Sequence, residues 1–267
     1  MDTVNAIILG IIQGLTEFLP VSSSAHLTFA EHLFKVDPNV RVSLDVLLHL
    51  GTLLALVVFF FKRILKIIAG LFSPFTDTRK ENWNIVLAIA VGTLPAVVFG
   101  YLLKDRIDAI FARPFYSAIF LLITGVVLFL TRRANGEKNR LSVVDGLVIG
   151  TAQAIAILPG ISRSGSTIAA ALFLGFARPE AFEFSFLLSI PAVLGAGLLK
   201  LKDSPLLQGG VADMRASALA SGFLVAAIVG ILALYLVKRI LMQRRFWFFS
   251  FYCWAVGILA LIFFGFR

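Results

Sequence analysis

The sequence predicts an all-α polytopic membrane protein with six full transmembrane helices and two re-entrant helix-loop-helix hairpins, arranged as an inverted-topology internal repeat. Three observations predict this class: an apolar composition, two polar islands that interrupt apolar runs, and a likeness between the two halves. Of the 267 residues, 59% are hydrophobic and 15% are charged, whereas a soluble domain carries about 25% charged residues. The connections between the apolar runs are too short to fold alone, so we expect a single transmembrane domain over residues 1–267.

The net charge of +9 would suggest a nucleic-acid partner in a soluble protein. Here the basic residues sit in loops beside apolar runs, which indicates anionic lipid headgroups and the positive-inside rule instead, so we expect no nucleic acid. Loops around 62–83, 132–178 and 238–245 hold 14 Lys and Arg residues, without Arg163, against 9 on the other side. The richer side is expected to be cytoplasmic, with both termini facing outward.

Six apolar runs are long enough to cross a bilayer, which takes roughly 20 residues. They lie at about 44–62, 84–103, 114–131, 181–199, 216–237 and 246–266. The first contains Asp45 and His49, and the fourth contains Glu183. Asp45 and His49 share a helix face, so they could line a cavity or bind a cation; a role at the span boundary is equally compatible with the pattern.

Two further regions, 4–35 and 143–177, are apolar but interrupted. The run from Val4 to Leu19 would rise only about 24 Å as a helix, which is shorter than a hydrocarbon core of about 30 Å. Pro20 and Pro159 follow the two runs, and proline disfavours helix at the preceding residue. Broken backbone at membrane depth is tolerated only inside protein or beside water. The pattern therefore predicts two re-entrant hairpins.

The two halves, about 1–135 and 140–267, also resemble each other. Gln13 and the pair at 19–20 match Gln153 and the pair at 158–159 after a one-residue slip. Each half then holds one hairpin and three spans. Because three is odd, the second half must be inverted relative to the first, which is a plan found in many transporters.

The first polar island brings together groups that can do chemistry. Gln13 and Glu17 are four residues apart and share a helix face. Ser22 and Ser23 lie one turn before His26, which places a nucleophile beside a base. Alternatively, the hydroxyls cap a helix and His26 is an interior histidine. Ionisable groups within a membrane segment favour the functional interpretation.

The second island supplies what an anion needs. Arg163 offers a planar fork of donors for phosphate oxygens. Ser162, Ser164, Gly165 and Ser166 precede or begin a helical run, so their backbone amides would form an anion site at a helix N-terminus. The alternative is an arginine that snorkels to the headgroups.

The chain resembles the undecaprenyl-diphosphate phosphatase family, the integral membrane enzymes associated with bacitracin resistance. The resemblance is sharpest at residues 14–23, GLTEFLPVSS, and 159–165, PGISRSG. It implies catalytic roles for Glu17, Ser23, His26 and Arg163 and phosphate binding by Ser162. The other residues expected to contact the substrate are Gln13, Ser22, Ser164, Gly165 and Ser166. The resemblance also implies a divalent cation, Mg²⁺ or Ca²⁺, with Glu17 as a ligand. Many members carry Glu where this chain has Gln13, and Thr-Gly where it has Ser-Ala at 24–25.

The function that this resemblance implies is removal of the terminal phosphate of undecaprenyl diphosphate, which regenerates the carrier lipid for peptidoglycan synthesis. It also implies a bacterial plasma (inner) membrane location and an active site facing the periplasmic side. We hypothesise that Arg163 and Ser162 hold the diphosphate while Ser23, activated by His26, attacks. A water deprotonated by His26, or His26 itself, is the alternative nucleophile. A transporter or flippase of a phosphorylated lipid is the rival function, and a homodimer is left open. The expected partners are the polyprenyl diphosphate and membrane lipids.

Overall fold

The computed structural model describes residues 3–34, 36, 38–103, 110, 113–202 and 216–265. The elements in these residues are helices, as the composition predicted. In chain order they are α1 (Thr3–Phe18), α2 (Ser23–Phe34), α3 (Pro38–Leu71), α4 (Thr76–Leu102), α6 (Pro114–Leu130), the 3₁₀ turn η1 (Thr131–Arg133), α7 (Val143–Ile155), α8 (Arg163–Phe173), α9 (Arg178–Lys202), α10 (Ala216–Met242), the 3₁₀ turn η2 (Phe246–Phe248) and α11 (Phe249–Gly265).

Six helices of the described residues are long and apolar enough to cross a membrane. They are Val40–Leu71, Thr76–Leu102, Pro114–Arg133, Arg178–Lys200, Ala216–Met242 and Phe246–Gly265. Each overlaps one of the six predicted runs, so the chain is a multi-pass membrane protein. Residue 35 of the predicted hairpin 4–35 and residue 266 of the predicted span 246–266 lie outside the described residues.

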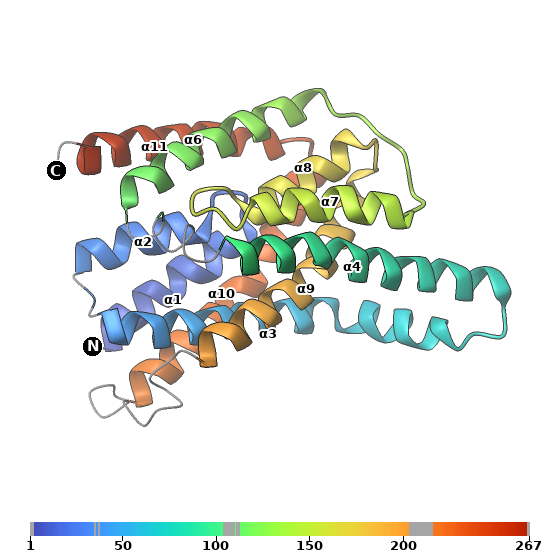
Figure 1. Ribbon diagram of the computed structural model, residues 1–267, viewed down its shortest axis with the longest axis horizontal. Helices are drawn as coiled ribbons and strands as arrows, with labels where there is room; N and C mark the ends of the chain where they lie inside the picture. Colours follow the sequence, from blue (N-terminus) through green and yellow to red (C-terminus); the bar gives the residue numbers. More distant parts are fainter. Residues whose placement is uncertain are drawn as a thin grey trace.

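The first span is longer than its apolar run. α3 continues past Lys62 and Arg63 and ends only at Leu71, shortly before Pro74. At 1.5 Å per residue, its 34 residues measure about 51 Å, well beyond a hydrocarbon core of about 30 Å. Charged side chains end an apolar run but not a helix, because they leave the backbone hydrogen bonds intact. The antiparallel ends of α3 and α4 therefore extend past the other helices (Figure 1).

Two pairs of shorter helices, α1–α2 and α7–α8, turn back on themselves. The breaks fall at residues 19–22 and 156–162, which contain Pro20 and Pro159 as predicted. Figure 1 shows α1 running inward from the N-terminal end with α2 returning, while α7 runs inward from the opposite end and α8 returns. The two turns meet in the interior of the molecule, where an amide of one donates to a hydroxyl of the other.

Glycines let each pair lie against a long helix of the other half. A Cβ on Gly10 would lie 2.7 Å from the carbonyl oxygen of Gly222 in α10, and one on Gly14 would lie 2.9 Å from that of Ala226. Likewise α7 packs on α4, where a Cβ on Gly150 would collide with the Gly92 carbonyl. Small residues four apart allow such close helix approach in membranes. This packing fixes the depth of both turns.

Aromatic side chains fill the core beside the turns. Phe18 at the end of α1 meets Phe186 of α9 edge to face, with ring centroids 5.7 Å apart. Phe186 also contacts Phe182 and, from α3, Phe60. Because these rings are buried, they hold α1, α3 and α9 together immediately next to the polar residues described below.

Candidate active site

The first turn is built around Ser22. This residue adopts φ 65°, a left-handed conformation uncommon for a residue other than glycine and often found at functional sites. Its Oγ accepts hydrogen bonds from the amide of Gly160 (3.2 Å) and, more weakly, from the amide of Ala25 (3.5 Å). Ser22, predicted as a substrate contact, therefore joins the two turns.

The second turn is built around Gly160. Its φ is 102°, and a Cβ there would collide with the carbonyl of Ser117 in α6, so glycine is required on two grounds. Thr124 of the same helix holds the turn from outside: its Oγ1 donates to the Gly160 carbonyl (2.8 Å) and accepts from the Ser162 amide (3.0 Å). α6 thus sets the position of the N-terminus of α8.

Further contacts lock the two turns together. Ser164 Oγ donates to the carbonyl of Leu19 (3.2 Å), and a Cβ on Gly165 would lie 3.3 Å from Cβ of Pro20. Ser162 is the N-cap of α8, with its side chain accepting from the Gly165 amide. Ser162 and Ser164 are buried, and Ser166 is half-buried.

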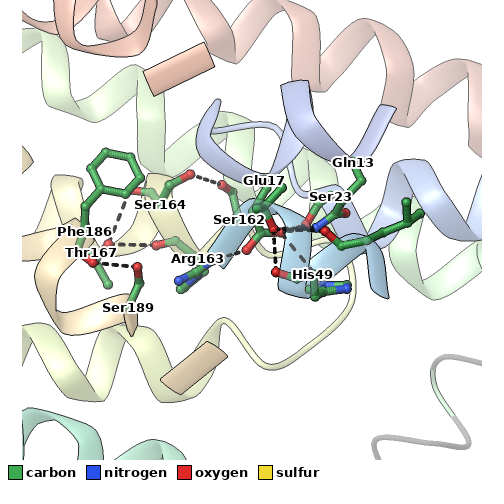
Figure 2. Close-up of polar contacts among 12 residues, drawn as sticks. Gln13, Glu17, Ser23, His49, Ser162, Arg163, Ser164, Thr167, Phe186 and Ser189 are labelled. Atoms are coloured by element: carbon green, nitrogen blue, oxygen red, sulfur yellow. Dashed lines mark hydrogen bonds and ion pairs between the residues drawn. The ribbon is translucent and has the colours of Figure 1, made fainter. Parts of the chain in front are cut away.

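The two islands meet at Glu17, which is 7% exposed. One carboxylate oxygen forms an ion pair with Nη2 of Arg163. The other accepts hydrogen bonds from Ser23 Oγ (2.6 Å) and Gln13 Nε2 (3.0 Å). Figure 2 shows these side chains converging from α1, α2 and α8. The structure therefore brings together Gln13, Glu17, Ser23 and Arg163, which the sequence assigned to one site.

His49 of α3 also belongs to this cluster. Its Nε2 lies 3.9 Å from Glu17 Oε2, while its Nδ1 donates to the Asp45 carbonyl (2.7 Å), since a carbonyl can only accept. Thr52, one turn further, accepts from Gln13 Nε2 at 3.5 Å. The sequence signal for His49 was an imidazole within an apolar run; Thr52 carried none.

His26 does not contact Ser23 as the sequence suggested. Its Nδ1 donates to the Ser22 carbonyl one turn earlier (2.9 Å), and its Nε2 lies 2.9 Å from the hydroxyl of Tyr252 in α11. The two rings also stack, with centroids 5.7 Å apart. Because Nδ1 carries the proton, Nε2 accepts from Tyr252. The imidazole is therefore held toward α11, and the hydroxyl of Ser23 is paired with Glu17.

Two polar atoms at the centre of the cluster have no hydrogen-bond partner within the described residues. They are Nη1 of Arg163 and Oε1 of Gln13, both buried. Buried polar atoms are normally satisfied, and one donor and one acceptor left over beside an ion pair suit a polar ligand. Across the described residues, three or more His, Cys, Asp and Glu side chains nowhere gather closely enough to hold a metal ion by themselves.

The sequence matches the family described as bacitracin resistance protein BacA over residues 6–259. The chain belongs to this family. The match runs from the first turn of α1 to the last turns of α11. It therefore includes every residue of the cluster around Glu17.

Individual relatives match over nearly their whole length. An undecaprenyl-diphosphatase of Methanobrevibacter smithii is 40% identical over 274 residues, covering 97% of each chain. One of Elusimicrobium minutum is 42% identical over 264 residues, covering 98% of each. One of Thermosipho africanus is 41% identical, covering 96% of this chain and 98% of the relative. The family resemblance found in the two motifs is thereby confirmed.

Proposed function

We propose that this membrane protein is an undecaprenyl-diphosphatase, which hydrolyses the terminal phosphate of undecaprenyl diphosphate and regenerates the monophosphate carrier lipid for peptidoglycan synthesis. Relatives with this name align over 97% of the chain. The observation that carries the proposal is the meeting of Arg163 and Ser23 at the buried carboxylate of Glu17. Bacitracin resistance follows from the same activity, as the family's name indicates.

The second turn binds the diphosphate. Nη1 of Arg163 is an unused donor, and guanidinium groups bind phosphate oxygens with two parallel hydrogen bonds. The first turn of α8, from Arg163 onward, adds backbone amides at a helix N-terminus, which favour an anion. Ser162 keeps that turn in shape through the Gly165 amide. Ser164 and Ser166 lie in this same turn of α8.

Phosphoryl transfer begins with Ser23. Its hydroxyl already donates to Glu17 at 2.6 Å, so Glu17 is placed to take the proton as the oxygen attacks the terminal phosphorus. The bond from that phosphorus to the bridging oxygen breaks, and undecaprenyl phosphate leaves. Water then releases inorganic phosphate from Ser23. An arriving diphosphate competes for Arg163, which frees the Glu17 carboxylate to act as the base.

His26 acts on this step from one turn away. It fixes the Ser22 carbonyl and contacts Tyr252, so it positions the turn that carries Ser23. This assignment differs from direct activation of Ser23 by His26.

A divalent cation, Mg²⁺ or Ca²⁺, fits the donors present. Glu17 offers a carboxylate and Gln13 an unused amide oxygen, and Mg²⁺ is commonly held by one or two carboxylates together with substrate phosphates. Gln13 and Glu17 would hold it. When bound, it offsets the charge that develops on the phosphate oxygens.

The two helix pairs are re-entrant hairpins of an inverted repeat in this proposal. Three features support it: the pairs enter from opposite ends, each breaks at a proline, and α1 on α10 corresponds to α7 on α4. In an inverted repeat such broken helices meet near the midplane and form the binding site. With the basic loops in the cytoplasm, the protein lies in the inner membrane and the site opens to the periplasmic side.

Phosphate release from undecaprenyl diphosphate by the purified protein in detergent tests the function. We expect steady release that stops with a chelator and returns with Mg²⁺ or Ca²⁺. Hydrolysis needs no membrane barrier, whereas transport does, so release in detergent separates an enzyme from a flippase. A purified, folded protein that releases no phosphate with either cation would contradict the proposal.

A further inference from the structure

A largely apolar groove lies beside the first pair of short helices, α1 and α2. It is a groove of about 600 Å³ between the end of α1, the end of α10 and the start of α11. Its walls are mostly apolar and include Leu15, Leu19, Val21 and Phe249. Its volume falls within the range of small-molecule sites in proteins.

The groove is separate from the cluster around Glu17. Leu15 is two residues from Glu17, which at about 100° per residue places it on the opposite side of α1. Glu17 is buried, whereas Leu15 is 37% exposed. A phosphate held by Arg163 would thus lie on the other side of the helix from this groove.

The lining of the groove also includes a basic and a polar residue. Arg245 and Gln243 line it, both side chains are exposed, and neither makes a hydrogen bond or ion pair with another described residue. The neighbouring Arg244 is engaged elsewhere, since it donates to Asn135. The Arg245 guanidinium has no side-chain partner among the described residues, and a guanidinium beside an apolar groove suits a phosphate that carries a hydrocarbon chain.

We propose that this groove binds an anionic glycerophospholipid. The phosphate lies against Arg245 and Gln243, and one acyl chain follows the apolar walls toward Tyr252. Three arguments favour this occupant: a guanidinium in the lining that has no side-chain partner among the described residues, the apolar remainder of the lining, and the basic loops at this end of the molecule. Basic loops mark the leaflet in which anionic lipids are found, and basic pockets between membrane helices bind their headgroups.

The groove adjoins the first turn, although its lining includes no residue of the cluster around Glu17. Tyr252 lines the groove and its hydroxyl donates to His26, and Val21 immediately precedes Ser22 in the first turn. A chain that fills the groove packs behind this turn and holds it in place. The bound lipid therefore raises the thermal stability of the hairpin and supports its catalytic geometry.

Lipid binding by native mass spectrometry tests the headgroup assignment. Delipidated wild-type protein is titrated with dioleoyl phosphatidylglycerol and with dioleoyl phosphatidylcholine. We expect phosphatidylglycerol to bind more tightly and Arg245→Gln to lower its affinity about fivefold, the contribution of one basic residue near an anionic surface. Arg239→Gln is the matched control, since Arg239 is exposed on the last turns of α10 but does not line the groove. Equal affinities in the wild type, or an unchanged preference in Arg245→Gln, would overturn the proposal.

A second pair of variants tests the acyl chain. Leu15→Trp fills the groove and should weaken both lipids, whereas Ile11→Trp, one turn earlier and similarly exposed, should leave them unchanged. Equal effects of the two would overturn the assignment of the groove. Undecaprenyl phosphate, the lipid product of the proposed reaction, is then added to the phosphatidylglycerol complex. If it displaces that lipid, and Arg245→Gln weakens both alike, the groove binds the polyprenyl lipid and the glycerophospholipid assignment is overturned. These readouts need no turnover, so they are independent of the proposed enzyme activity.

Discussion

At the scale of single residues, Glu17 has the most demanding environment in the site. It is nearly inaccessible to solvent, yet it carries a charge that Arg163 balances and three further side chains approach. Leaving one partner of a buried ion pair without the other is costly. The arrangement is therefore expected to be sensitive to every change that alters charge.

Substitution of Ser23 and of its neighbour Ser24 tests whether the Ser23 hydroxyl is the nucleophile. Ser23→Ala removes the hydroxyl that donates to Glu17 and should lower kcat by about three orders of magnitude or more, as loss of a nucleophile does in other enzymes. Ser24→Ala is the control. The Ser24 hydroxyl lies in the same turn but is bonded to Ser22 Oγ and, weakly, to the Gly160 amide, whereas the hydroxyl that donates to Glu17 belongs to Ser23. Phosphate release under saturating substrate measures both. A Ser23→Ala enzyme as active as Ser24→Ala would exclude Ser23 as the nucleophile.

The geometry of the guanidinium can be tested with its charge kept. Arg163→Lys retains one positive charge but loses the planar fork that serves Glu17 and a phosphate together. We expect kcat/KM to fall about 10²-fold, the usual effect of losing one positioned donor. Arg239→Lys should change nothing, because that side chain is exposed on α10. If both lysine variants hydrolyse substrate equally well, charge alone suffices and the fork plays no part.

The sequence identified most of these residues but not all of their pairings. Gln13 and Glu17 were predictable because helical periodicity places residues four apart on one face. The partner of His26 was not, because Tyr252 is 226 residues away and only the packing of α11 brings it near. Ser23 and His26 are adjacent on α2, but orientation at the start of the helix, set by the φ of Ser22, sends the hydroxyl to Glu17.

At the scale of elements, the glycine contacts determine how deep the two turns lie. Pro20 and Pro159 predicted that α1 and α7 end shortly before them, because proline lacks the amide hydrogen that a helix needs and this effect is local. The full length of α3 was not predictable from hydropathy, because a helix continues wherever its hydrogen bonds remain satisfied. The contact of α1 with α10 was not predictable either, because these helices belong to different halves of the chain. Its sequence signal is limited to small residues such as Gly10 and Gly14.

A larger side chain at the α1–α10 contact should separate these helices. Gly14→Val places its Cβ 2.9 Å from the Ala226 carbonyl and 3.0 Å from the Gly230 amide nitrogen, and overpacking of this kind costs about 1–3 kcal/mol. We expect a lower Tm in detergent and a loss of phosphate release. Gly195→Val is the control, since its added Cβ would meet no atom of another described segment within 4 Å. Equal Tm values for the two variants would show that the close approach does not contribute to stability.

At the scale of the whole molecule, the helix pairs α1–α2 and α7–α8 enter from opposite ends and bring their turns together at Glu17 and Arg163. The sequence predicted the six long apolar helices found in the described residues and the two interruptions. The inverted repeat, the side on which the site opens, the cation and the homodimer stay predictions.

Cysteine labelling in intact cells tests the orientation. In a Cys253→Ser background, Arg113→Cys at the start of α6 and Asn139→Cys in the loop before α7 introduce thiols at exposed positions. Because the basic loops are expected in the cytoplasm, an impermeant maleimide should label position 113 in intact cells and position 139 only after permeabilisation. The reverse pattern would place the active site on the cytoplasmic side.

The central claim is that Glu17 and Arg163 act as one unit across the two turns. A double-mutant cycle tests it most directly, with phosphate release measured for Glu17→Gln, Arg163→Gln and the double variant. Groups that act together show strongly non-additive losses, so the double variant should be no slower than the slower single variant. Losses that multiply, or a single variant that retains wild-type turnover, would contradict a shared site.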